Sequence, residues 1–234
     1  MDFPPSWLFP VSTADAISAQ AVMAQKVIQE DVMDIPSLIG GMDVSNNLYD
    51  PEQMIHASAV VLSYPSLQVI DEASVSQKQT FPYIPGLLGF RESPALFEAF
   101  QRLRIKPEVL MIDGHGVSHP RGLGIASHLG VLLDMPTVGV AKSILVGKPA
   151  GPLGAEAGAQ IPLLWKGRIL GMLLRTKVRS NPLIISAGHK IALPTAVKLV
   201  QSCLQGYRLP EVTRQAHLAA NACRKSYLIS SATC

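Results

Sequence analysis

Three acidic residues occupy places in the sequence where carboxylates are able to do chemistry: Asp43, Glu92 and Asp113. Asp113 directly follows the apolar run Val109–Ile112, which predicts a strand buried on both faces, and glycines follow it. Asp43 stands in or at the end of a second predicted strand, residues 38–44. A carboxylate at the carboxyl end of a buried strand, beside glycines that let a ligand approach the backbone, is typical of the active edge of an α/β sheet.

These three acids are candidates for a metal-binding cluster. Hard divalent ions such as Mg²⁺ prefer carboxylate oxygens and keep several waters. An ion held in this way can promote cleavage of a phosphodiester, because it activates water and stabilises the leaving oxygen. Glu92 also stands just before a predicted helix that starts with Ser93 as N-cap and Pro94 as first residue. Glu92 could therefore serve only to complement the helix dipole.

Two further residues extend the candidate catalytic set. Lys142 follows the predicted strand Thr137–Val140, which delivers it to the same end of the sheet as Asp113. His217 lies on a predicted C-terminal helix, residues 210–222. It is interpreted either as a core histidine or as a proton carrier and outer partner of a metal-bound water.

A zinc site is an alternative chemistry for this sequence. His115 and His119 are four residues apart, and His128 follows, but the first two lie in a loop rich in glycine and proline. Side chains four residues apart are brought together by a helix, so the spacing carries little weight here. The sequence shows no nucleophilic serine elbow, no P-loop and no dinucleotide-binding fingerprint that opens a helix after a strand. Esterase, nucleotide hydrolase and dehydrogenase functions are therefore disfavoured.

Short elements of both kinds must position these side chains. Strands are expected at 38–44, 55–62 and 67–75, joined tightly enough for an antiparallel meander. The predicted strand–helix–strand unit from Val109 to Val140 calls for a parallel, right-handed crossover. Further segments are predicted as a helix at 14–30, a hairpin at 161–165 and 169–176, a strand at 181–186 and a helix at 194–204.

The order of these elements predicts an α/β fold, in which helices flank both faces of a mixed sheet. We expect a single domain over residues 1–234, with an irregular N-terminal arm at 1–12 and a mobile surface excursion, rich in glycine and alanine, at 150–160. Between them, residues 80–86 form a stiff loop, because two prolines bracket Tyr83 and Ile84.

Composition limits the partners and the compartment. The chain is 48% hydrophobic and 16% charged, without an apolar run long enough to span a membrane or a basic N-terminal signal. Its three cysteines lack metal-ligand spacing, which favours a reduced, cytoplasmic protein. Residues 1–165 hold nine Lys and Arg against 16 Asp and Glu, whereas residues 166–234 hold 11 against one. This split suits a protein that holds a divalent metal with one half and a polyanion with the other.

Several of these segments, taken together, resemble endonuclease V, the family of deoxyinosine-directed nucleases. The resemblance covers roughly residues 35–220 and is specific because the motifs occur together in this order. Departures are the proline-rich arm, the excursion at 150–160, and Val212 where members often have proline. The matching motifs are Pro82–Gly86, Phe90–Glu92, Asp113–Gly116 with His119–Arg121, Gly124–His128, Pro136–Lys142 and Gly206–Pro210 with Thr213 and Arg214.

This resemblance implies a ribonuclease-H-like fold and a DNA repair endonuclease that depends on Mg²⁺, with Mn²⁺ as a substitute. The implied reaction is hydrolysis of the second phosphodiester bond 3′ to a deaminated purine, with 3′-hydroxyl and 5′-phosphate products. By position, Asp43 and Asp113 match the family's metal-binding aspartates, Glu92 its catalytic glutamate and His217 its late active-site histidine. Lys142 is expected near the scissile phosphate.

The resemblance also implies how a damaged base is recognised. Tyr83, in the loop Pro82, Tyr83, Ile84 and Pro85, matches the wedge that fills the gap left by a flipped base. An aromatic wedge offsets the cost of unstacking, and proline rigidity avoids ordering the loop on binding. Glycine backbone groups suit the edge of hypoxanthine. The residues that match the base pocket are Gly86, Leu88, Gly114, His119, Gly124, Ile125 and Ala141.

The expected partner is DNA that contains deaminated bases, bound by a monomer away from any membrane. Inosine-containing RNA stays open as a substrate, because a contact to a 2′-hydroxyl cannot be located from a loop sequence. The main alternative function is a non-cleaving inosine-binding module that recruits repair factors. It predicts binding that survives chelation, without strand scission.

Overall fold

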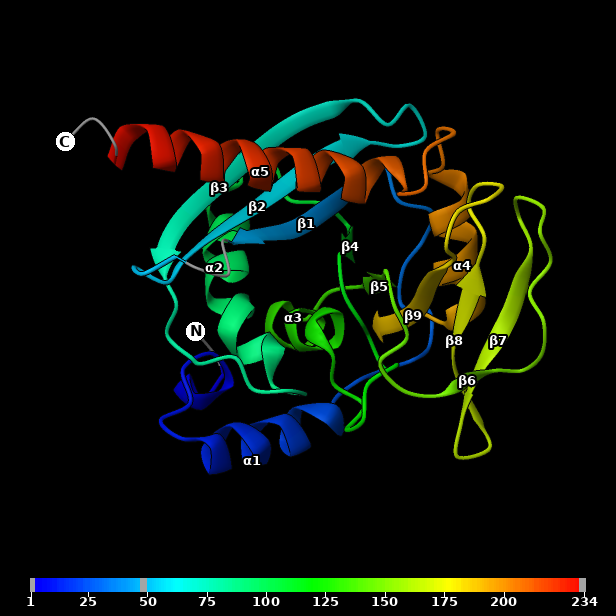
Figure 1. Cartoon of the computed structure of the whole chain (residues 1–234), viewed down its shortest axis with the longest axis horizontal. Coiled ribbons are helices and arrows are strands. Elements are labelled where there is room, and N and C mark those ends of the chain that lie inside the picture. Colours follow the sequence, from blue (N-terminus) through cyan, green and yellow to red (C-terminus); the bar gives the residue numbers. More distant parts are fainter. Residues whose placement is uncertain (1–2, 47–49, 232–234) are drawn as a thin grey trace.

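A computed structural model describes residues 3–46 and 50–231 of the 234-residue chain. Its described strands form one nine-stranded sheet in the order β3-β2-β1-β4-β5-β9-β8-β7-β6, with helices on either side (Figure 1). Residues 1 and 2 of the predicted arm, and Cys234, lie outside the described residues. No helix in the described part of the chain is both long and apolar enough to cross a bilayer.

One half of the sheet contains the predicted meander and the parallel strands. β1 (Leu38–Asn46), β2 (Met54–Ser63) and β3 (Val69–Lys78) pair antiparallel in sequence order. β1 also pairs in parallel with β4 (Val109–Ile112), and β4 pairs in parallel with β5 (Thr137–Ala141). The predicted mixed sheet is therefore confirmed, and the strands fall where the apolar runs predict them.

The other half of the sheet is antiparallel. β9 (Leu183–His189) pairs with β5, and β8 (Arg168–Leu174) and β7 (Gln160–Trp165) follow as the predicted hairpin. A short edge strand that the sequence did not predict, β6 (Lys148–Pro149), pairs with β7. Residues 150–159 connect these two strands and are mostly exposed, while their mobility stays a prediction.

Alternating side chains of the central strands face two separate cores. Leu110 and Ile112 pack into a core that also contains residues of α1 (Thr13–Ala24), α2 (Leu88–Arg102) and α3 (Ile125–Leu133). Val109 and Met111 pack into a second core, on the opposite face, because successive strand side chains point to opposite sides. That face is covered by α4 (Leu193–Ser202) and α5 (Glu211–Ser231), and α5 runs across β1, β2 and β3 (Figure 1).

The N-terminal segment joins the first of these cores. A single 3-10 turn, η1 (Pro5–Trp7), precedes α1, and the side chains of Trp7 and Leu8 are buried. Ser12 caps α1, because its hydroxyl accepts the backbone N–H of Asp15 at 3.1 Å. The arm is therefore packed against the sheet's helical layer.

Three predicted helix boundaries are wrong. α2 begins at Leu88, so Glu92 lies within the helix and Pro94, predicted to open it, stands in its interior. Phe90 is buried, and its ring packs against Phe81 and His128. This packing makes the first turn of α2 part of the core, and it outweighs the free-energy cost of a proline inside the helix.

The first helix was predicted to reach residue 30, but α1 ends at Ala24. The chain beyond it pairs with the end of β9 instead, since the backbone N–H of Lys190 donates to the carbonyl of Ile28 at 2.7 Å. The last helix, predicted to end near 222, continues as α5 to Ser231 along the meander.

Close approach of α5 to β1 requires glycine at position 41. A Cβ built there would lie 2.3 Å from the backbone oxygen of Val212, at the start of α5. Backbone cannot yield as a flexible side chain can, so a larger residue must push α5 away from β1. Gly41 therefore sets the distance between the strand that carries Asp43 and the helix that carries His217.

We expect Gly41→Ala to lower the free energy of unfolding by about 1–3 kcal/mol, because it overpacks this contact. Urea denaturation measures the change. Gly151→Ala is the control, since its added Cβ would meet only a side-chain methyl at 3.4 Å. Equal stability of the two variants would contradict the assignment.

Candidate active site at the carboxyl ends of the parallel strands

Asp43 and Asp113 come together because they follow paired positions on neighbouring parallel strands. Met42 of β1 is in register with Ile112 of β4, so the next residue on each strand is an aspartate. The backbone N–H of Asp113 donates to the carbonyl of Met42 at 3.1 Å, which continues the strand pairing to the site. Asp43 is buried and Asp113 is half-buried. Of the three acids predicted to converge, these two lie together, and their role as metal ligands stays a prediction.

His217 brings a third potential ligand from α5. Its Nδ1 lies 2.7 Å from Oδ2 of Asp43. One ligand atom from each of Asp43, Asp113 and His217 lies within 4.8 Å of the others, which suits a shared metal ion. The two carboxylates therefore fit a divalent cation, and the imidazole serves as a partner of Asp43, because both of its ring nitrogens are engaged by Asp43 and Asn221.

Lys142, at the end of β5, forms an ion pair with Oδ2 of Asp113. The other carboxylate is held from its own strand, because the backbone N–H of Val44 donates to Oδ1 of Asp43 at 2.7 Å. The predicted place of Lys142 at the acidic end of the sheet is confirmed.

Burial and neighbouring charges raise the pKa values of Asp43 and Glu92. Burial, followed by repulsion from Asp113, raises the pKa of Asp43 to about 6, and its hydrogen bond with His217 partly offsets these effects. Burial also raises the pKa of Glu92 to about 8, with a further contribution from Asp43 and an opposing one from Arg91. Negative charge is therefore costly here without a cation, as a metal site predicts.

Glu92 stands apart from the tight group. It lies in the second turn of α2, and the group of ligand atoms within 4.8 Å contains Asp43, Asp113 and His217 but not Glu92. It is near enough for Asp43 and Asp113 to affect its pKa. The interpretation of Glu92 as a dipole partner ahead of a helix is wrong, because the helix starts four residues earlier.

Sequence reasoning missed the residues that orient His217. The amide Nδ2 of Asn221 lies 3.0 Å from the carbonyl oxygen of His217 and 3.0 Å from its ring Nε2, and Ser45 donates its hydroxyl to Oδ1 of Asn221 at 2.8 Å. Since a carbonyl only accepts, the nitrogen of the Asn221 amide must face His217. Nε2 then accepts, so the ring proton resides on Nδ1 and is donated to Asp43. The spacing of four residues on a helix was the available signal.

The predicted wedge residues form an exposed loop between β3 and α2. The side chain of Tyr83 is 65% exposed, with the guanidinium of Arg91 5.8 Å from its ring centroid. Pro82 and Pro85 are exposed and Ile84 is half-buried against the core. An exposed ring on a proline-bounded loop has the geometry that a wedge requires.

The predicted base-pocket residues fall into two connected parts. His119 accepts the backbone N–H of Arg121 at 3.2 Å, and a guanidinium nitrogen of Arg121 donates to the carbonyl of Gly86 at 2.6 Å. In the other part, a Cβ at Gly114 would lie 2.4 Å from the side chain of Ile125. The remaining predicted residues are Gly124 and Ala141, which are buried, and Leu88, which is exposed at the start of α2.

The two loop histidines do not support zinc. Nε2 of His115 donates to the carbonyl of Ser143 at 2.9 Å, while Nδ1 of His119 accepts a backbone N–H. Burial lowers the pKa of His115, and burial followed by Arg121 lowers that of His119 to about 4, so both rings are neutral near pH 7. Among the residues described, neither histidine belongs to a group of three possible ligands.

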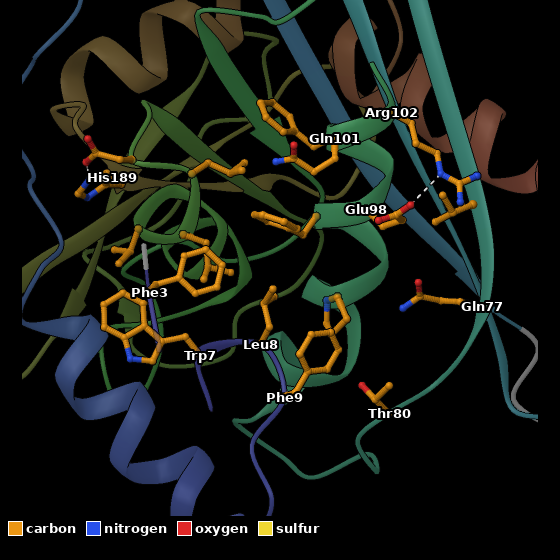
Figure 2. A pocket seen from close by; sticks show the side chains of 18 of the residues that line it. Phe3, Trp7, Leu8, Phe9, Gln77, Thr80, Glu98, Gln101, Arg102 and His189 are labelled. Carbon is orange, nitrogen blue, oxygen red and sulfur yellow. Dashed lines mark hydrogen bonds and ion pairs between the residues drawn. The ribbon is translucent and has the colours of Figure 1, made fainter. Parts of the chain in front are cut away.

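A cavity of about 1450 Å³ lies away from this site (Figure 2). The N-terminal segment with Phe3, Trp7, Leu8 and Phe9 borders it on one side and the α2 residues Glu98, Gln101 and Arg102 border another. None of the predicted site residues lines it. The size of a cavity is therefore a poor guide to the chemistry of this protein.

Comparison with known proteins agrees with this geometry. A family model for endonuclease V matches residues 21–218. The chain belongs to the endonuclease V family. A curated endonuclease V from Protochlamydia amoebophila is 54% identical over 224 residues, which cover 96% of this chain and 95% of the relative. The metal dependence expected of this nuclease family fits the acidic cluster.

Solved endonuclease V structures share the fold. The enzyme from Streptomyces avermitilis superimposes with a TM-score of 0.87 at 35% identity and covers 99% of this chain and 98% of its own. A variant of the Ciona intestinalis endonuclease V, in complex with DNA that contains an inosine followed by a ribo-adenosine, gives a TM-score of 0.79 at 28% identity, covering 91% and 95%. The predicted fold class and family are confirmed.

The raised pKa of Glu92 predicts how metal-free stability depends on pH. Between about pH 4.5 and about pH 8 the unfolded chain releases this proton while the folded protein retains it, so the folded state loses stability as the pH rises. Replacement of the carboxyl removes this loss. We expect Glu92→Gln to gain roughly 1 kcal/mol or more relative to the unmodified chain between about pH 5 and about pH 8.

Urea denaturation in the presence of a chelator measures this gain. Glu98→Gln is the matched control, because Glu98 lies on the same helix with its side chain 47% exposed and pairs with Arg102. A gain in the Glu92→Gln variant that is the same at both pH values would contradict the electrostatic interpretation.

Proposed function

We propose that this protein nicks DNA at the second phosphodiester bond 3′ to a deaminated purine, deoxyinosine above all, leaving 3′-hydroxyl and 5′-phosphate ends. The observation that supports this most directly is that one ligand atom from each of Asp43, Asp113 and His217 lies within 4.8 Å of the others, at one edge of the sheet. The chain also belongs to a family of DNA repair endonucleases. The inosine-containing DNA bound by the Ciona intestinalis relative supports the choice of lesion.

The residues at this edge would hold Mg²⁺, with Mn²⁺ as a substitute. Carboxylate oxygens of Asp43 and Asp113 are the expected ligands, and relief of their mutual repulsion would favour binding. Such an ion supplies a Lewis acid for the phosphate and makes water more acidic. Glu92 is proposed to act from α2, where a nearby dication would stabilise its ionised form.

The chain's own groups then orient the reacting phosphate. His217 holds Asp43 through its Nδ1 proton, and Asn221 keeps that proton in place. Lys142, which pairs with Asp113, is proposed to contact the scissile phosphate. The wedge is assigned to Pro82, Tyr83, Ile84 and Pro85, and the base pocket to Gly86, Leu88, Gly114, His119, Gly124, Ile125 and Ala141.

The contacts of His119 support a role in shaping the base pocket. With a pKa of about 4 its imidazole is neutral at pH 7, its Nδ1 accepts the backbone N–H of Arg121, and the ring also hydrogen-bonds with the carbonyl of Gly86. Hypoxanthine offers an acceptor at O6 and a donor at N1, the reverse of adenine, so backbone N–H and C=O groups of the pocket glycines are proposed to discriminate between them.

We also propose that the protein acts as a monomer in the cytoplasm. Cys203 is buried and free, and burial raises the pKa of its thiol to about 11, which suits a reduced structural cysteine. Inosine-containing RNA is an alternative substrate that the assays below can include.

We expect Asp113→Asn to reduce nicking of a deoxyinosine duplex in Mg²⁺ by roughly 10³-fold or more, because one carboxylate ligand is lost. A gel assay that maps the cut position measures this loss, and calorimetry with Mg²⁺ or Mn²⁺ measures ion binding. Asp134→Asn, at an exposed aspartate beyond α3, is the control.

Two outcomes would contradict the proposal in different ways. Full activity of Asp113→Asn would overturn the assignment of the acids. Binding of deoxyinosine DNA by the unmodified protein that survives chelation, without scission in either metal, would favour the non-cleaving module instead.

The wedge makes a separate prediction. We expect Tyr83→Ala to weaken binding to a deoxyinosine duplex about tenfold and to a deoxyinosine single strand less than about threefold, because only the duplex leaves a gap to fill. Tyr83→Phe keeps the ring and should bind as the unmodified protein does. Fluorescence anisotropy measures both affinities, and equal losses on the two substrates would count against a wedge.

A further inference from the structure

A buried glutamine of the N-terminal helix lies beside the recognition loops. Gln20 belongs to α1 and is 2% exposed. It precedes the part of the chain, residues 21–218, that matches the family model. No role in the proposed chemistry has been given to it or to α1. A buried amide must be fully hydrogen-bonded, so the partners of Gln20 show what it does.

All the polar contacts of Gln20 are made to two loops that are remote in sequence. Its Nε2 donates to the carbonyl of Gly86 at 3.0 Å and to the carbonyl of Leu123 at 3.1 Å. Its Oε1 accepts from Nε of Arg121. Both donor hydrogens and the acceptor are therefore used.

The two loops are those assigned to lesion recognition. Gly86 directly follows the wedge loop, and Arg121 and Leu123 belong to the loop that runs from His119 to Gly124. Arg121 closes the arrangement, because its Nη2 also donates to the carbonyl of Gly86, at 2.6 Å. Gln20 and Arg121 together clamp the end of the wedge loop to the pocket loop.

Position 86 favours glycine over a residue with a side chain. Its φ of +80° lies in the left-handed region that favours glycine. A Cβ there would lie 2.8 Å from Nη2 of Arg121. The carbonyl of Gly86 accepts from Gln20 and Arg121, and His119 also hydrogen-bonds with it, at the point where the chain passes from the wedge loop to α2.

We propose that Gln20 is a positioning residue for lesion recognition: it fixes the spacing between the wedge loop and the base-pocket loop without touching DNA. This inference rests on the proposed function. Residues that hold a binding loop in its bound geometry reduce the cost of ordering it, so their loss weakens binding more than it slows the chemical step. Asp43 lies on β1 and Asp113 directly follows β4, so we expect these two acids to keep their contacts when Gln20 changes. Glu92 lies farther along the chain than Gly86, in the second turn of α2.

Gln20→Met tests this inference, because methionine keeps the length of the side chain and removes its hydrogen bonds. Single-turnover nicking of a deoxyinosine duplex in Mg²⁺, over a range of enzyme concentrations, separates the half-saturating concentration from the maximal rate. We expect the half-saturating concentration to rise about tenfold and the maximal rate to change less than about twofold. Gln25→Met is the matched control, since Gln25 ends the same helix in an exposed position.

A second readout follows the base itself. The fluorescence of a 2-aminopurine placed beside the deoxyinosine rises when the neighbouring base leaves the stack. We expect Gln20→Met to need about tenfold more protein for half of this rise. Gln25→Met should match the unmodified protein.

Folding of each variant is checked by circular dichroism. If Gln20→Met does not fold, Arg121→Lys should give the same separation of the two kinetic constants, because it retains the charge and loses the paired contacts to Gln20 and Gly86. An unchanged half-saturating concentration in the folded variant overturns the inference. A fall in the maximal rate by the same factor as the rise in the half-saturating concentration also overturns it. Failure of the unmodified protein to nick deoxyinosine DNA would instead overturn the proposed function.

Discussion

Repulsion between two carboxylates is the constraint on which the rest of this structure depends. Asp43 and Asp113 are forced together by the register of β1 and β4, and the raised pKa of Asp43 reflects both its burial and that proximity. Two other elements offset this repulsion. Lys142, directly after β5, forms an ion pair with Asp113, and His217 on α5 hydrogen-bonds with Asp43. The carboxylates of such a site repel one another until a cation binds, because they are held in place before the reaction begins.

The sheet supplies this geometry because its central strand β4 is buried on both faces. Leu110 and Ile112 face one core while Val109 and Met111 face the other, so β4 cannot shift by one residue without exchanging its two faces. That rigidity fixes where Asp113 emerges. Gly41 fixes the position of α5 relative to β1, since the missing side chain allows α5 to lie close enough for His217 to contact Asp43.

Much of the fold could be predicted from local pattern. The run Val109–Ile112 identified its strand, and the glycines and aspartate after it identified the active edge. The failures came where distant packing outweighs local preference. Ser93 and Pro94 form a good helix start by themselves, yet the burial of Phe90 moves the start of α2 to Leu88.

The candidate site shows the same division. Asp43, Asp113, Lys142 and His217 were found because each follows a strand or matches a family motif. Ser45 and Gln20 were not, because their hydrogen bonds span more than 60 residues of sequence, and Asn221 was not, although its spacing of four residues from His217 was a local signal. Polar residues in helices are common on solvated surfaces, and only three-dimensional contacts distinguish the buried ones.

The pairing of Asp43 with His217 spans 174 positions of the chain. β1 leaves the ribosome long before α5, so the imidazole of His217 is absent while the strands that position the two aspartates are being made. Until α5 has emerged, Asp43 lacks this partner and the second core lacks the residues that α5 contributes to it. The order of synthesis therefore delays the complete group of Asp43, Asp113 and His217 until α5 has been made.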